Sequence, residues 1–209
     1  MILAIETSTM EASLALLEPD SGEVLWQAAF ESDRLHNAKI FEPVVEALEI
    51  CREKLQQIVV GLGPGSYSGV RVGISVANGL SLALDAPVAG LASIAVLSDE
   101  EEFIVTGDAR RSSYYLAHIQ NRRLKSEPEL VDKESWENQI ATLRKKGLKI
   151  YTTEKPLLSQ YADTIELRKP DAEELAKEVS AMDKAEWSER VEQTLQPIYL
   201  RAPYITLPK

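Results

Sequence analysis

The chain has 209 residues, of which 44% are hydrophobic, and its formal net charge is -10. This length and apolar content can bury a full core in one large or two small domains, as in an ordinary globular protein. Residues 1–99 hold 5 basic against 13 acidic residues, so this half repels phosphate backbones and argues against direct nucleic-acid binding.

Three strand-length apolar runs open the chain. The runs are ILAIET, ASLALLE and EVLWQAAF, separated by the turn sequences STME and PDSG. They predict a three-stranded meander. The first run carries no basic residues and meets a carboxylate at Glu6, which is typical of a strand and not of a signal peptide.

An apolar face then recurs at helical spacing and predicts a helix over residues 35–55. Its apolar positions are Ile40, Phe41, Val44, Val45, Leu48, Cys51 and Leu55. Cys51, the single cysteine of the chain, falls in this stripe and is expected in the core. One cysteine allows no internal disulfide, which fits a reducing cytoplasm.

A glycine-rich loop, GLGPGSYSGVRVG, follows the predicted strand IVVG and leads into a predicted helix over residues 69–84. The turn DAPVAG divides the apolar residues that follow into pieces too short to cross a bilayer, so no membrane segment is expected.

Backbone N–H groups and a positive helix end make such a loop a candidate anion site, with Gly63, Gly65, Ser66 and Ser68 as its residues. The Walker A pattern is excluded because no lysine lies between Lys54 and Lys125. The spacing also disfavours a dinucleotide fingerprint and a serine-hydrolase nucleophile elbow.

Close packing is the alternative use of these glycines. Ser66 or Ser68 can cap the helix, and Gly69, Gly73 and Ala77 share one helical face where another backbone can approach. The helix is apolar nearly all round, so one side packs on its own sheet, and we expect another chain to cover the other side.

An acidic run near residue 100 predicts a boundary between domains 1–99 and 100–209. Beyond it, FIVTGDARRSSYYLAHI repeats the plan of strand, polar turn and strand, with Asp108 in the place of Glu6, and predicts a duplicated α/β unit. A helix over 134–146, a strand LKIYTT, a helix over 172–182 and an extended proline-containing tail complete the prediction.

Four segments together resemble the TsaB (YeaZ) family of tRNA threonylcarbamoyladenosine biosynthesis proteins. These segments are LAIETST, VGLGPGSYSGVRVGISVANGLSLAL, GDARRSSYY and PIYLR. The resemblance runs from residue 2 to about residue 201. Glu6 stands where the family more often has aspartate, which weakens a cation-holding role.

The resemblance implies an actin-like ATPase (ASKHA) fold of two ribonuclease H-like halves with mixed sheets, the second half reduced. It implies a non-catalytic cytoplasmic subunit that supports threonylcarbamoyl transfer by TsaD to N6 of adenosine 37 in tRNAs reading ANN codons, together with the ATPase TsaE. The chain alone is expected to be a homodimer and to meet tRNA at most indirectly. The expected interface residues are Gly69, Gly73, Val76, Ala77, Leu80, Phe41 and Val45.

The sequence favours the absence of catalysis, of a cofactor and of a metal. A catalytic relative needs two histidines one turn apart, whereas His36 is followed four residues later by Ile40. After residue 100 the only glycines are Gly107 and Gly147, too few for a second phosphate loop.

Two other functions stay open. The chain could be a nucleotide-dependent actin-like enzyme, a small kinase or carbamoyltransferase, with Glu6 and Asp108 as magnesium carboxylates; a metallopeptidase ranks last. Asp108, Arg110 and Arg111 form a structural ion-pair cluster by preference, with contact to tRNA or to TsaE as the alternative.

Overall fold

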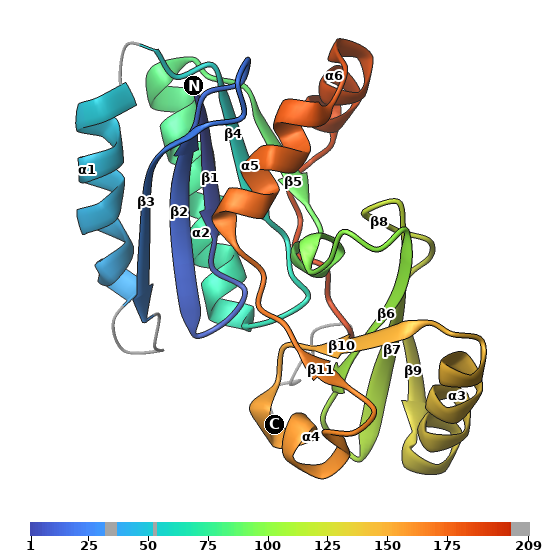
Figure 1. Cartoon of the computed structure of the whole chain (residues 1–209). Coiled ribbons are helices and arrows are strands. Elements are labelled where there is room, and N and C mark those ends of the chain that lie inside the picture. Colours follow the sequence, from blue (N-terminus) through green and yellow to red (C-terminus); the bar gives the residue numbers. More distant parts are fainter. Residues whose placement is uncertain (32–36, 52–53, 202–209) are drawn as a thin grey trace. The chain divides into compact units, whose positions relative to one another are not determined.

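The structure is a computed structural model that describes residues 1–31, 37–51 and 54–201. It divides into two compact units. The first comprises Met1–Asp99 and Lys169–Pro197, and the second comprises Glu100–Arg168 and, among the described residues, 198–201. Each unit is built on its own sheet (Figure 1).

The first sheet has five strands in the order β3-β2-β1-β4-β5. The strands are β1 (Ile2–Glu6), β2 (Glu11–Leu17), β3 (Val24–Glu31), β4 (Gln57–Gly61) and β5 (Val88–Leu91). The first three pair antiparallel, which confirms the predicted meander, and β4 and β5 continue the sheet in parallel with β1.

Helices cover both faces of this sheet (Figure 1). They are α1 (Phe41–Cys51) and α2 (Tyr67–Leu84) on one face and α5 (Ala172–Ala181) on the other. Alternation along β1 divides its side chains, because Leu3 and Ile5 pack with α1 and α2 whereas Ile2 and Ala4 pack with α5. Burial on both faces explains why β1 reads as a continuous apolar run.

The first predicted helix is shorter than its apolar stripe suggested. A 3-10 turn, η1 (Asn37–Ile40), precedes α1, which ends at Cys51 in the described chain. Cys51 is buried in the core, as predicted. The second helix, α2, begins two residues earlier than predicted because the Ser66 side chain accepts the N–H of Gly69 and caps it.

The second sheet has the order β11-β10-β6-β7-β8, and β9 also pairs with β7. Its strands are β6 (Glu102–Asp108), β7 (Ser113–Gln120), β8 (Arg123–Leu124), β9 (Glu129–Asp132), β10 (Lys149–Thr152) and β11 (Glu166–Leu167). The helices α3 (Lys133–Lys145) and α4 (Lys155–Tyr161) belong to this unit.

The core of the second unit is organised around Trp136, which is fully buried in α3. Its ring stacks on Tyr114, with ring centroids 4.6 Å apart. Its indole N–H donates to Thr106 Oγ1 at 2.7 Å, and that hydroxyl donates to the Tyr115 carbonyl at 2.6 Å. This chain of hydrogen bonds satisfies the polar atoms that the packing buries.

The two units repeat one strand plan. In the first, β1 pairs antiparallel with β2 and parallel with β4; in the second, β6 pairs antiparallel with β7 and parallel with β10. Glu6 and Asp108 are the last residues of β1 and β6, so the predicted equivalence of these two carboxylates is confirmed. The mixed sheets and the repeated plan are those of the predicted actin-like α/β fold.

The division of the chain differs from the simple split at residue 100. The segment 169–197, expected in the C-terminal domain, belongs to the first unit because α5 packs on β1 and β2. The same segment holds α6 (Lys184–Glu192), which the apolar pattern does not reveal. Residues 194–201 form neither helix nor strand, in keeping with the predicted extended tail.

Candidate functional site

The glycine loop lies against the turn that follows β1 in the same unit. Ser66 N–H donates to the Ser8 carbonyl at 2.6 Å, and Thr7 Oγ1 donates to the Gly69 carbonyl at 2.8 Å. A Cβ at Gly65 would lie 2.1 Å from the Ser8 carbonyl oxygen. Glycine is therefore needed at this position because the backbone of the same chain passes there.

Two backbone N–H groups of the loop donate hydrogen bonds within the first unit. Gly63 N–H donates to Ser93 Oγ at 3.0 Å, the N–H of Ser66 is taken by Ser8, and Pro64 has no N–H. The Ser66 hydroxyl oxygen accepts from Gly69 N–H at 3.2 Å. Of the expected anion-binding residues, Gly63 and Ser66 thus serve the fold, while Gly65 is exposed and Ser68 is half-buried.

Glu6 is a fully buried carboxyl group at the end of β1. Its Oε1 accepts the Ser8 N–H at 2.6 Å. Its Oε2 and the Ser8 hydroxyl have no hydrogen-bond partner within the described part of the chain. Burial raises the pKa of Glu6, and the negative charge of Asp171 raises it further, whereas the hydrogen bond from the Ser8 N–H lowers it.

This arrangement is a poor fit for the magnesium nucleotide that an actin-like fold implies. Glu6 Oε2 fills the space beside Gly61, where an added Cβ would lie 2.0 Å from it, and the side chain has no exposed surface. The described residues hold no group of three or more histidine, cysteine or acidic side chains arranged for a metal ion. His36, the single candidate from the first predicted helix, lies outside them.

The expected interface residues of α2 fall on two different faces. Gly69, Gly73 and Ala77 are buried toward their own sheet, and a Cβ at Gly73 would lie 2.4 Å from Thr7 Oγ1. These three residues pack inside the first unit, which differs from the expectation that they meet another chain. Val76 and Leu80 are half-buried at the border of this core.

The exposed apolar side chains of this region lie elsewhere on the two helices. Phe41 and Val45 of α1, both expected at an interface, are 58% and 55% exposed. On α2, Leu82 is 89% exposed, and Gly79 has no atom within 4 Å of an added Cβ. Leu82 and Gly79 were not among the expected interface residues, although Ser75, Gly79 and Ala83 repeat the same four-residue spacing on the opposite face.

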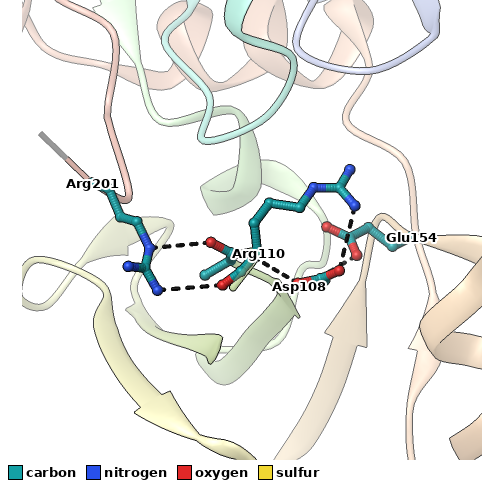
Figure 2. Close-up of polar contacts among 5 residues, drawn as sticks. Asp108, Arg110, Glu154 and Arg201 are labelled. Atoms are coloured by element: carbon teal, nitrogen blue, oxygen red, sulfur yellow. Dashed lines mark hydrogen bonds and ion pairs between the residues drawn. The ribbon is translucent and has the colours of Figure 1, made fainter. Parts of the chain in front are cut away.

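The turn after β6 carries the second candidate cluster (Figure 2). Asp108 Oδ1 accepts the Arg110 N–H at 2.6 Å, and its Oδ2 lies 3.4 Å from the Arg110 guanidinium. Glu154, two residues beyond β10, accepts the Asp108 N–H at 3.0 Å. The structure thus joins Asp108 and Arg110 in an ion pair, the arrangement that the sequence favoured, and adds Glu154, which it missed.

Burial is the main cause of the raised pKa values of Glu154 and Tyr115. The pKa of Glu154 is raised by burial first and by the charge of Asp108, while the Asp108 N–H and Arg110 lower it. Tyr115 is buried beside it, and burial followed by the charge of Glu154 raises its pKa. The carboxylates of Asp108, at the end of β6, and of Glu154, after β10, therefore accept hydrogen bonds from groups of the same unit.

A family model described as TsaD: tRNA N6-adenosine threonylcarbamoyltransferase matches residues 31–186. The chain belongs to this family. Curated relatives carry the name tRNA threonylcarbamoyladenosine biosynthesis protein TsaB, and solved structures carry the name YeaZ. The resemblance to the TsaB (YeaZ) family is therefore confirmed.

Three TsaB relatives show the extent of the match. The Bacillus subtilis protein is 35% identical over 100 residues, 46% of this chain and 43% of that protein. The Haemophilus influenzae protein is 29% identical over 136 residues, which are 60% of this chain and 56% of that protein. The Escherichia coli protein is 33% identical over 130 residues, which are 57% of this chain and 54% of that protein. The chain thus spans about half the length of the curated relatives it matches.

Two solved structures from Pseudomonas aeruginosa share the fold. A protein described as similar to peptidase YEAZ has a TM-score of 0.69 and 25% identity, covering 96% of this chain and 99% of that chain. YeaZ from the same organism has a TM-score of 0.67 and 24% identity, covering 95% of this chain and 99% of that chain.

Within the described residues, no helix of this TsaB-family chain is both long and apolar enough to cross a bilayer.

Proposed function

We propose that this chain acts in tRNA threonylcarbamoyladenosine biosynthesis as a non-catalytic, cytoplasmic subunit. In this proposal it binds the catalytic subunit TsaD, together with the ATPase TsaE, and supports transfer of the threonylcarbamoyl group to N6 of adenosine 37 in tRNAs reading ANN codons. On its own it pairs with a second copy through the same surface, and it meets tRNA at most indirectly.

The exposed apolar surface of α1 and α2 carries the proposal. Phe41, Val45 and Leu82 are large apolar side chains that are more than half exposed, on helices that cover the same face of the first sheet. Large apolar side chains exposed on the helices of one sheet face are candidates for a protein interface, although single exposed apolar residues are common. We name Phe41, Val45, Gly79 and Leu82 the helix surface.

Gly79 supports a close approach by another chain at this surface. A glycine inside a helix costs about 0.5–1 kcal/mol relative to alanine. Gly73 is explained by its contact with Thr7, but a Cβ at Gly79 would meet nothing of its own chain. A backbone from a partner helix can use this gap, as small residues allow at tight helix contacts.

The polar groups support the absence of catalysis by this chain. Glu6 is buried away from solvent, and Gly63 and Ser66 donate their N–H groups within the first unit. In the second unit, Asp108 is paired with Arg110. Of the two carboxylates that a nucleotide-dependent enzyme would use for magnesium, Glu6 thus lies inside the fold and Asp108 is paired with an arginine.

Reconstitution of the tRNA modification tests the role directly. Purified TsaD, TsaE, tRNA and a source of threonylcarbamoyl adenylate are combined with and without this chain, and modified adenosine is measured. We expect product only when the chain is present, and none from the chain alone with the same substrates. Product without it would contradict the proposal, as would product from the chain in the absence of TsaD.

The substitution Leu82→Asp tests the helix surface. We expect at least a tenfold loss of affinity for TsaD, because a carboxylate would be buried among apolar groups. At a concentration at which the chain is monomeric, its thermal midpoint should stay nearly unchanged, because exposed substitutions usually alter stability by less than about 0.5 kcal/mol. Titration calorimetry with TsaD measures the first and circular dichroism the second.

A matched control is Leu130→Asp, at an exposed leucine on β9 in the second unit. This variant should bind TsaD as the unmodified chain does. Equal losses in both variants would indicate a general effect of added charge and would count against the helix surface. Binding of ATP by the isolated chain, measured in the same calorimeter, would revive the nucleotide-dependent enzyme as the function.

A further inference from the structure

The turn between β6 and β7 holds three consecutive residues in the left-handed backbone region. Arg110, Arg111 and Ser112 have φ angles of 65°, 54° and 57°. Residues with a Cβ disfavour this region because the Cβ crowds the following carbonyl oxygen. Such a run persists only where surrounding contacts over-determine it.

Contacts within the turn close its two ends. Asp108 Oδ1 accepts the Arg110 N–H at 2.6 Å, and Ala109 N–H donates to the Ser113 carbonyl at 2.9 Å. Ser113 N–H donates in return to the Arg110 carbonyl at 3.2 Å. From the neighbouring strand, Glu154 fixes the N–H of Asp108.

Arg201 adds the long-range contact (Figure 2). Its Nε donates to the Ala109 carbonyl at 3.2 Å, and one terminal nitrogen donates to the Arg110 carbonyl at 3.3 Å. The planar guanidinium presents these donors in a fixed geometry, so it fixes the directions of two successive carbonyls at once. Rotating either peptide out of the left-handed conformation would break a hydrogen bond to a charged donor.

We propose that Arg201 clamps the β6–β7 turn in its left-handed conformation, with residues 198–201 as the strap that carries the clamp. Arg201 is a positioning residue in this proposal. The contact joins GDARRSS and PIYLR, two segments some 90 residues apart that carried the family resemblance. It also fixes the backbone from which the Arg110 side chain, 83% exposed, projects beside Asp108.

Limited trypsin digestion of the full chain tests the clamp. Trypsin cleaves after Arg110 and Arg111 only when the turn opens, so the cleavage rate reports the open population. We expect Arg201→Gln to speed cleavage at these bonds by about tenfold, the effect of losing hydrogen bonds from a charged donor. Arg201→Lys keeps the charge but loses the planar guanidinium, so its cleavage rate should fall between those of the unmodified chain and Arg201→Gln.

The chain supplies its own reference site. Arg122 and Arg123 lie in and beside the turn between β7 and β8, where Arg122 also has a positive φ, and no contact with Arg201 is present there among the described residues. Cleavage after these residues should stay unchanged in both variants. As a matched control, Arg168→Gln removes an arginine of the same unit that does not touch the turn.

Each outcome decides the proposal. Faster cleavage at Arg110 and Arg111 alone supports the clamp. Equal acceleration at Arg122 and Arg123 means that Arg201 stabilises the whole unit and overturns it. Unchanged cleavage at both sites, or the same acceleration in Arg168→Gln, overturns it too. The test needs no TsaD or tRNA, so its result is separate from that of the proposed function.

Discussion

Burial decides whether Glu6, a carboxyl group at the end of a strand, is a metal ligand or a neutral acid of the core. Its position at the end of β1 fits a ligand for magnesium, yet the group has no exposed surface and its Oε2 has no hydrogen-bond partner among the residues described. A buried carboxyl without a cation favours its neutral form. We therefore interpret Glu6 as a buried acid of the first unit.

The pH dependence of stability tests this interpretation. Burial raises the pKa of Glu6 above its ordinary 4.5. From that value up to the raised value, the folded chain keeps a proton that the unfolded chain releases, so the free energy of unfolding falls as pH rises. Glu6→Gln cannot ionise and should remove this loss, most visibly near pH 8, in urea denaturation across pH 4.5–8.

The exposed carboxylate Glu23 gives the control. Glu23→Gln should leave the pH profile of the unmodified chain in place. A Glu6→Gln profile parallel to that of the unmodified chain would mean that Glu6 ionises as easily in the folded chain as in the unfolded one. The interpretation as a buried acid would then be wrong.

Sequence spacing predicted that Gly69, Gly73 and Ala77 share one face of α2, and it could not tell what that face meets. The helix is apolar on several sides, so periodicity alone does not decide which side turns to the sheet. The deciding contacts come from Thr7, about 60 residues earlier in the chain. Long-range contacts of this kind have no local signature.

At the scale of the element, two glycines of one helix give opposite predictions. Gly73→Ala should destabilise the chain by about 1–3 kcal/mol, because its Cβ would lie 2.4 Å from Thr7 Oγ1 and displace a buried hydrogen bond. Gly79→Ala should stabilise the isolated chain by about 0.5–1 kcal/mol, because it meets nothing and lowers the entropy of the unfolded state.

Urea denaturation of the two variants measures both effects. Destabilisation by Gly79→Ala at a concentration at which the chain is monomeric would indicate that this residue is packed within its own unit, and the helix surface would lose its support. For the same reason, a large residue such as Trp at position 73 would test folding and not pairing with a partner. A bulky side chain there would displace Thr7 and disturb folding before any partner is met.

Elements with a strong period were predicted and short polar ones were missed. The meander, β4, α2, β6, β7, α3, β10 and α5 follow from their apolar patterns. The strand β5 was not predicted, because Pro87 and Gly90 in and beside it are typical of a turn. A Cβ added at Gly90 would lie 2.6 Å from the Leu62 side chain. The helix α6 has no buried residue, but its Asp183 cap, three residues before Glu186, was a usable signal.

At the scale of the whole molecule, the charge predicts how salt affects self-association. Each copy carries a formal net charge of -10, so two copies repel each other at long range. Salt screens this repulsion and leaves apolar contacts intact. We expect the dissociation constant of the proposed homodimer to fall several-fold between 50 and 300 mM NaCl, measured by sedimentation equilibrium. A rise would indicate that opposite charges dominate the paired surface.

The duplicated plan was predictable at this scale because both halves open with the same pattern of apolar runs and a carboxylate. The membership of residues 169–197 in the first unit was not predictable, because it depends on which of the two sheets the apolar stripe of α5 packs against. That stripe is compatible with either sheet when only the sequence is known.

The return of α5 also sets an order of events during synthesis on the ribosome. Until residue 181 has been made, the β1 and β2 side chains that pack against α5 stay uncovered, whereas the second sheet is encoded by one continuous stretch. At about 5–20 residues per second, a growing chain leaves this apolar face uncovered for seconds, and a chain truncated after residue 99 or 168 would leave it uncovered permanently. The half that is translated first is therefore the last to close.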